Sequence, residues 1–192
     1  EALAVDAFEA VVRCFGNLTF LYSIAGRLRD LLEIAAEGAK TCQRFGPLLL
    51  VASTLVENWV YALVATGRWD EAEELAAELL QQWAAEGMAL ALHLELAQIA
   101  AARGDGASFE RQISIIERFA RPDDPYALHD VTSARAENLL WQGDADEAYR
   151  IARESLGHLA DQQDAGLVVS MCSLALRAHA DLVTARADRV IR

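Results

Sequence analysis

Apolar residues recur at every third or fourth position along most of the chain. In the clearest stretch they are Trp69, Ala72, Leu75, Ala76, Leu79, Leu80 and Trp83. This spacing places them on one face of an α-helix, and the stretches that begin at Phe109 and Ala145 repeat it. Alternation typical of strands never holds for long, and good helix formers dominate. The pattern predicts an all-α protein.

Glycines separate the predicted helices at nearly constant intervals. They are Gly26, Gly67, Gly104 and Gly143, spaced by 41, 37 and 39 residues. A glycine that follows an apolar helix can adopt a positive φ and end that helix. A polar cap then starts the second helix, and we expect these caps at Asp70, Ser108 and Asp146.

A second set of breaks lies between these glycines, at residues 45–47, near 86–87, at 121–125 and near 161–166. The repeating unit is therefore a helix, a glycine turn, a helix and a loop. Helical hairpins of fixed period predict an α-solenoid, because one hairpin cannot bury both of its faces alone. We expect about four helix hairpins plus a terminal helix.

Composition narrows the class of protein. Hydrophobic residues make up 54% of the 192, which excludes a disordered chain. The net charge of -12 argues against direct nucleic-acid binding by this chain. Three irregularly spaced cysteines do not form a disulfide framework, so we expect small buried thiols in a reducing cytoplasm. The most membrane-like stretch, residues 48–66, has Glu57 and Asn58 at its centre, which favours a buried helix and no membrane partner.

The sequence offers no recognisable catalytic, cofactor or metal motif. The run from Gly104 to Gly106 lacks the strand and the lysine of a phosphate loop. No Ser-His-Asp or Cys-His arrangement stands out, and no cysteine or histidine pair has metal-ligand spacing. We interpret His93 as a core histidine and His129 as a surface residue. We therefore expect no enzyme, no cofactor and no metal in this chain.

Two turns resemble those of tetratricopeptide (TPR) repeats. Residues 67–72 (GRWDEA) and 143–148 (GDADEA) carry a glycine and an alanine five positions later. Trp69 also fills the place two positions after the glycine, which is often aromatic in that family. The copy at Gly104 has Phe109 where alanine is usual. The resemblance implies that residues 1–192 form a single TPR-like α-solenoid.

A narrower resemblance concerns residues 58–73 and 175–182, which are similar to segments of large bacterial LuxR-type transcriptional regulators. Those proteins carry an ATPase of the AAA/STAND kind, a long TPR-like arm and a C-terminal DNA-binding helix-turn-helix. The resemblance implies a non-catalytic sensing or docking arm within a larger cytoplasmic protein. Two alternatives stay open: a TPR scaffold module of another multidomain protein, and a domain that binds a small, sugar-like molecule.

The TPR resemblance also implies where a partner binds, because the first helix of each hairpin lines a concave groove in that family. If the turn glycines align, the inward positions include Glu57, Tyr61, Gln98, Glu137 and Trp141. Acids and aromatics suit a basic protein or peptide segment, or a small-molecule effector such as a polyol. Alternatively these residues are only solvated, or pack on the next hairpin. Arginines from Arg177 onward make the C-terminal end basic, which we interpret as a helix end rather than a DNA contact. An oligomer stays possible.

Overall fold

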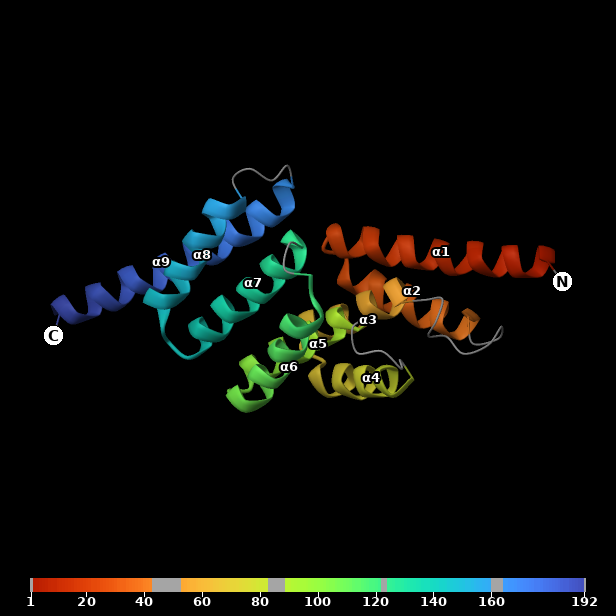
Figure 1. Cartoon of the computed structure of the whole chain (residues 1–192), viewed down its shortest axis with the longest axis horizontal. Helices are drawn as coiled ribbons and strands as arrows, with labels where there is room; N and C mark the ends of the chain where they lie inside the picture. Colours follow the sequence, from red (N-terminus) through yellow and green to blue (C-terminus); the bar gives the residue numbers. More distant parts are fainter. Residues whose placement is uncertain (1, 43–52, 83–88, 122–123, 160–163, 192) are drawn as a thin grey trace. The chain divides into compact units, whose positions relative to one another are not determined.

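The computed structural model describes residues 2–42, 53–82, 89–121, 124–159 and 164–191 (Figure 1). Within these ranges the chain forms helices and no strand, which confirms the predicted all-α class. The helices are α1 (Ala2–Ile24), α2 (Leu28–Cys42), α3 (Ser53–Ala65), α4 (Trp69–Gln82), α5 (Leu90–Ala102), α6 (Gly106–Phe119), α7 (Pro125–Trp141), α8 (Ala145–Leu159) and α9 (Ala165–Ile191).

The four turn glycines have positive φ angles, as predicted. Their values are +66° at Gly26, +76° at Gly67, +73° at Gly104 and +80° at Gly143. At the third turn, the N–H of Asp105 donates to the carbonyl of Ala100 over 2.9 Å, and the N–H of Gly104 donates to that of Ala101. The same two hydrogen bonds recur at the other three turns, so each first helix ends in a Schellman motif.

The predicted capping residues were wrong. The residue directly after each glycine occupies the N-cap position of the second helix, where its carbonyl accepts the first helical hydrogen bond. At the third turn this residue is Asp105, whose side chain accepts a hydrogen bond from the N–H of Ser108 over 3.0 Å. Asp144 accepts in the same way from Glu147 over 3.2 Å. Asp70, Ser108 and Asp146 instead lie inside the first turn of their helices. The Schellman geometry leaves no spacer between the two helices, which moves each cap toward the glycine.

Two of the predicted breaks between hairpins, at 121–125 and near 161–166, coincide with the gaps between α6 and α7 and between α8 and α9. The helices α2, α4, α6 and α8 stop at Cys42, Gln82, Phe119 and Leu159. Residues 45–47 and 86–87, which prompted two of these predictions, lie outside the described residues, as does Trp83. Before α7, Asp124 caps the helix through the N–H groups of Tyr126 and Ala127.

Burial follows the same register in every hairpin. Five positions after each turn glycine stand Leu31, Ala72, Phe109 and Ala148, all buried. Nine positions after it stand Ala35, Ala76, Ile113 and Ala152, all fully buried. Seven positions before it stand Thr19, Val60, Ala97 and Ala136, again buried. Residues at the same distance from each turn glycine are therefore buried in the same way, and the core resembles that of a helical repeat.

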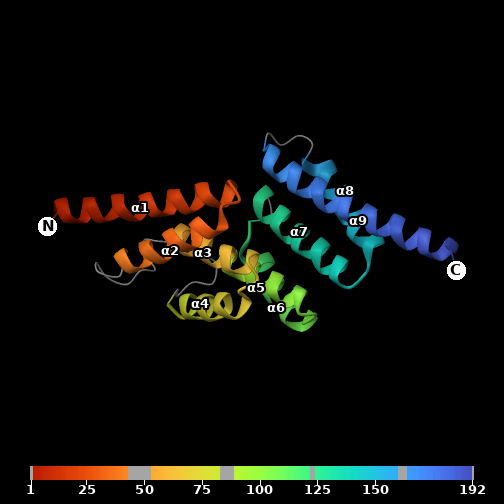
Figure 2. The ribbon, with the colours of Figure 1, turned by 180° about the vertical axis from the view of Figure 1, so that it is seen from behind.

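Two compact units make up the chain, residues 1–95 and 96–192. In the first unit, α1 packs against α2 and α3, α2 packs against α3, and α3 packs against α4. In the second unit, α6 packs against α7, α7 packs against α8 and α9, and α8 packs against α9 (Figures 1 and 2). All of these contacts join helices that are one or two elements apart in sequence.

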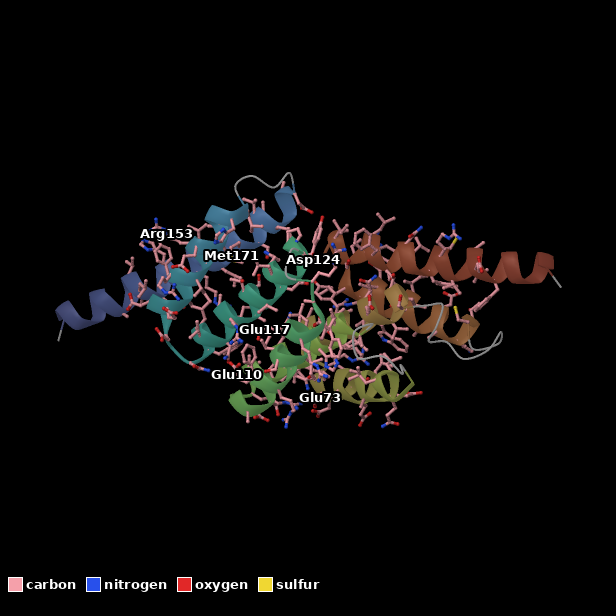
Figure 3. All side chains as sticks on the ribbon, viewed as in Figure 1. Glu73, Glu110, Glu117, Asp124, Arg153 and Met171 are labelled. Carbon is pink, nitrogen blue, oxygen red and sulfur yellow. The ribbon has the colours of Figure 1, made fainter. Side chains whose placement is uncertain are left out.

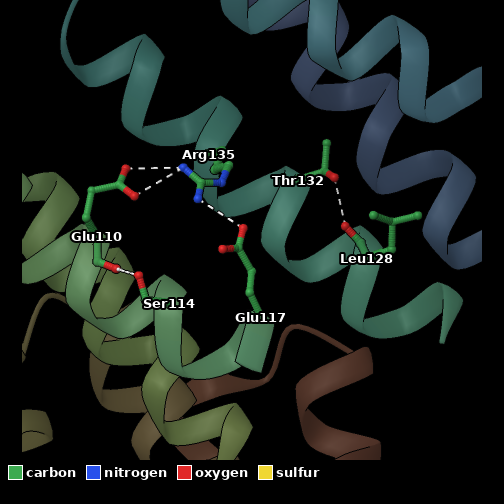
Figure 4. A network of polar contacts seen from close by, with 6 residues as sticks. All are labelled: Glu110, Ser114, Glu117, Leu128, Thr132 and Arg135. Carbon is green, nitrogen blue, oxygen red and sulfur yellow. Dashed lines mark hydrogen bonds and ion pairs between the residues drawn. The ribbon is translucent and has the colours of Figure 1, made fainter. Parts of the chain in front are cut away.

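A polar bridge joins α6 and α7 on the surface of the second unit. The guanidinium of Arg135 on α7 donates to both carboxylate oxygens of Glu110, over 3.2 and 3.4 Å (Figure 4). It also donates to Glu117 over 3.0 Å. Exposed ion pairs of this kind contribute about 0–1 kcal/mol, so this bridge orients α6 on α7 more than it stabilises the unit.

Gly38 of α2 packs closely against both α1 and α3. A Cβ at this position would lie 2.8 Å from Cγ of Phe15 on α1 and 3.1 Å from Cδ2 of Leu55 on α3. Contacts below 3.0 Å require a neighbour to shift, and Cγ of a packed ring is not a flexible end. Only glycine allows the three helices to approach this closely.

We expect Gly38→Ala to lower the free energy of unfolding by about 1–2 kcal/mol, because overpacking exceeds the gain in helix propensity. Urea denaturation monitored by circular dichroism measures the change. Gly157→Ala is the matched control: a Cβ at Gly157 in α8 meets no atom within 4 Å, so this variant should gain about 0.5–1 kcal/mol. Equal effects of the two substitutions would contradict the packing described for Gly38.

One described segment, Ala165–Ala185 of α9, is long and apolar enough to cross a membrane by length and composition. Its most apolar window has a mean hydropathy of 1.4, and 22% of that window is buried. Of the predicted stretch 48–66, residues 48–52 lie outside the described residues. Residues 53–65 form α3, which buries Leu55, Val56, Val60, Ala62 and Leu63.

Candidate functional site

The first unit places Glu57 and Tyr61 one helical turn apart on α3. Leu55, Val56 and Val60 bury the other side of this helix, so the two polar side chains share its solvent-facing side. Glu57 is half-buried and forms no ion pair with the described residues, and burial raises the pKa of its carboxyl. The Tyr61 side chain is 38% exposed.

A buried carboxylate adds to this pair. Glu95 on α5 is 7% exposed. The pKa of the Tyr61 hydroxyl is raised, first by burial and then by the negative charge of Glu95. Glu57, Tyr61 and Glu95 therefore form an acidic, aromatic cluster within residues 1–95, which we call the Tyr61 cluster. Sequence reasoning missed Glu95, because only the packing of α5 brings it near α3.

The second unit places Glu137 and Trp141 one helical turn apart on α7. The Trp141 side chain is 57% exposed, and the guanidinium of Arg177 on α9 lies 5.9 Å from the centre of its ring. Burial raises the pKa of the Glu137 carboxyl, and the charge of Arg177 partly offsets that rise. The sequence alone places Arg177 in a basic chain end. The contact of α7 with α9 instead brings it to the predicted site residues.

The five predicted site residues fall into separate groups. Glu57 and Tyr61 share a face of α3, and Glu137 and Trp141 share a face of α7. Gln98 is a half-buried residue of α5 in the second unit, and no described contact joins it to Glu137 or Trp141. Two local surfaces of different charge are therefore present, and a continuous groove through all five residues stays a prediction.

His129 is buried at 6% exposure, so its interpretation as a surface residue was wrong. Its Nε2 lies 3.4 Å from Oγ of Ser133, one turn later on α7. Its Nδ1 is buried and has no hydrogen-bond partner among the described residues. Burial lowers the pKa of the imidazole, while the charge of Asp164 acts in the opposite direction.

Among the described residues, the His129–Ser133 pair has no third group that would complete a nucleophilic triad. Such a triad needs an acid that accepts a hydrogen bond from Nδ1 and orients the ring. Asp164 is the nearby acid, but its carboxylate accepts from the hydroxyl of Tyr126 over 2.9 Å and from the N–H of Gly166 over 2.8 Å. We therefore interpret this cluster as a tether between α7 and the start of α9.

The cysteines and metal-ligating side chains form no further site within the described ranges. Cys42 is buried as predicted, whereas Cys14 is exposed and Cys172 is half-buried, so the prediction of three buried thiols was wrong. No group of three or more His, Cys, Asp or Glu side chains in the described part of the chain could hold a metal ion.

A cavity of about 270 Å³ opens between α1 and α3. Its lining includes Glu9, Arg13 and Asn17 of α1 and Thr54 of α3.

Comparison with known proteins identifies no relative: no protein-family model, curated protein or solved structure matches the chain.

Proposed function

We propose that this chain is a non-catalytic docking arm, a TPR-like solenoid that binds a basic protein segment. The observation that carries the proposal is the Tyr61 cluster, in which Glu57 and Tyr61 place an acid and an aromatic ring on α3, the first helix of a hairpin. The repeated turn and burial register supports the helical-repeat architecture. Within a larger LuxR-type regulator, such an arm would receive a partner or effector.

A cation is the occupant that this surface favours. Burial disfavours the charged form of Glu57, and a Lys or Arg side chain would remove much of that cost by pairing with its carboxylate. The half-exposed Tyr61 ring can also accept a cation on its face, worth about 0.5–1 kcal/mol at an exposed site. An acidic ligand would gain neither contribution.

Docking would act on the regulator by changing the populations of its states. A partner that binds the arm better in one state shifts the protein toward that state, in proportion to its differential affinity. Two states at 1:99 require about 5.5 kcal/mol of differential affinity to reach 99:1, so a moderate peptide affinity shifts such a balance only in part.

Peptide binding by the 192-residue chain tests the docking proposal. We expect saturable binding of Arg- and Lys-rich peptides by fluorescence polarisation, and no binding of Glu-rich peptides of equal length. Glu57→Gln and Tyr61→Ala should each weaken binding about tenfold, equivalent to 1.4 kcal/mol. Glu74→Gln, at an exposed position of α4 in the same unit, is the matched control for net charge.

The charge control also separates docking from general attraction to an acidic protein. Equal losses of peptide affinity in Glu57→Gln and Glu74→Gln would show that the peptides are attracted only by the net charge of -12. Absence of saturable binding to any basic peptide would remove the docking proposal.

The reading frame that encodes the chain separates a regulator from a scaffold, since a regulator requires a phosphate loop and a helix-turn-helix in the same protein.

A second candidate function rests on the exposed Trp141. A flat aromatic surface beside the half-buried Glu137 suits a sugar-like ligand, which stacks on the ring and donates a hydroxyl hydrogen bond to the carboxylate. Arg177 over the ring would have to move for this ligand to stack. A thermal-shift screen with mono- and disaccharides measures such binding, and a shift that survives Trp141→Ala would exclude this site.

A further inference from the structure

The last helix has two apolar faces, and its own unit covers only one of them. Met171, Leu174 and Ala175 are buried in a core cluster with residues of α7 and α8 (Figure 3 labels Met171). On the opposite side, Val169 is 67% exposed, Leu176 is 69% exposed and Val183 is 52% exposed. These three residues are seven positions apart, so they lie along one line of the helix.

Small residues fill the gaps in this line. Ser173 and Ala180 are exposed and stand between the larger side chains, at steps of four and then three residues. The α9 seam is therefore Val169, Ser173, Leu176, Ala180 and Val183. It holds no charged side chain over about 21 Å of helix. Steps of four and three are the spacing by which one helix packs along another.

We propose that the α9 seam pairs with the α9 seam of a second copy of this chain, with the two helices antiparallel. A two-fold axis level with Ala178 sets Leu176 opposite the partner's Ala180. The same axis sets Val183 opposite the partner's Ser173. Every described layer between Ser173 and Val183 then joins one large and one small side chain, which allows close packing without a void.

A parallel pair would be less complementary. It would set Leu176 against its own copy in one layer and Ala180 against its own copy in the next, so that crowded and empty layers alternate. Charge does not oppose the antiparallel pair, because Arg177, which flanks the seam, lies near the Glu137 carboxylate of its own molecule. The large and small residues thus specify both the occupant and its direction.

A protein helix suits this face better than lipid. Arg177, His179 and Asp181 are exposed within the same apolar segment, and a charged side chain at the centre of a bilayer costs at least about 2.5–3.5 kcal/mol. One helix pair buries less than the roughly 1,200–2,000 Å² of a standard interface, so we expect a weak dimer with a micromolar or weaker Kd.

Sedimentation velocity on the 192-residue chain, from about 5 to 500 μM, tests the pairing. We expect a monomer–dimer equilibrium for the native chain and a monomer throughout for Leu176→Glu. Leu176 is exposed, so this variant should keep the native circular dichroism melt. Ser170→Glu is the matched control: it adds the same charge at an exposed position outside the seam and should leave the dimer intact.

A distance measurement tests the direction. Spin labels at Ser170→Cys, with Cys14→Ser and Cys172→Ser in the background, should lie about 24 Å apart along the axis of an antiparallel pair. Labels side by side would overturn the proposed orientation. A native chain that stays monomeric, or Leu176→Glu and Ser170→Glu acting alike, would overturn the pairing.

A third experiment measures binding to anionic phospholipid vesicles. Binding of the monomer to vesicles, with its loss in Leu176→Glu, would reassign the seam to a membrane surface and overturn the dimer. The inference does not depend on the docking proposal: Tyr61→Ala should leave the dimer unchanged, and Leu176→Glu should leave binding of basic peptides unchanged.

Discussion

Phe109→Ala is expected to lower the free energy of unfolding by about 3–5 kcal/mol. Phe109 is 1% exposed and is among the largest fully buried side chains of the described core. The positions equivalent to it in two other hairpins hold Ala72 and Ala148, so a rule based on the repeat would expect a neutral or stabilising change. Packing predicts the opposite, because the neighbours of Phe109 surround a ring and would leave a cavity around a methyl group.

Urea denaturation of the native chain and of two variants measures this effect. Phe119→Ala on the same helix is the control, since Phe119 is 40% exposed and its removal should cost about 1 kcal/mol or less. A loss below about 1 kcal/mol for Phe109→Ala would show that the repeat pattern, and not the observed burial, describes this position.

Asp130→Asn is expected to stabilise the chain at pH 8 by about 1–3 kcal/mol, with no difference below pH 4. Burial and the charge of Asp124 raise the pKa of the Asp130 carboxyl from 3.8 to about 6. Between these values the folded state holds a proton that the unfolded state has released, so the native chain loses stability as the pH rises through this window. The full pKa difference corresponds to about 3 kcal/mol, and partial exposure of the carboxyl to solvent lowers the expected gain toward about 1 kcal/mol.

Chemical denaturation of both proteins at pH 4, 6 and 8 measures this difference. His129 acts in the other direction, because burial lowers its pKa and stability is lost as the pH falls. Subtracting the two profiles isolates Asp130, since His129 is present in both proteins. Asp181→Asn on α9 is the exposed control and should change stability by less than about 0.5 kcal/mol. A difference independent of pH would show that the carboxyl is not buried.

Local chemistry made much of the fold predictable. A glycine between two apolar stripes predicts a left-handed helix end, and all four turn glycines have it. The helical spacing of apolar residues predicts which face is buried, and Ala72, Ile113 and Ala152 are fully buried. Both signals depend on a few adjacent residues, so one sequence is sufficient to detect them.

The features that sequence missed depend on contacts between helices. Arg177 meets Trp141 because α9 packs against α7, and the charge of Glu95 reaches Tyr61 from a different helix. His129 is likewise buried by contacts between helices, whereas the loop that precedes it in the sequence suggests exposure. The capping error is different: Asp105 and Ser108 are both good caps, and only the turn geometry decides between them.

The short range of the helix contacts has a consequence for synthesis of the chain. In the first unit, α1, α2 and α3 pack against one another, and the last of them ends at Ala65. These helices have their mutual partners as soon as that residue leaves the ribosome, long before α9 is translated. Local contacts also favour rapid folding. Nascent chains just long enough to place Ala65 outside the ribosome should therefore already resist protease, while the C-terminal half is still unmade.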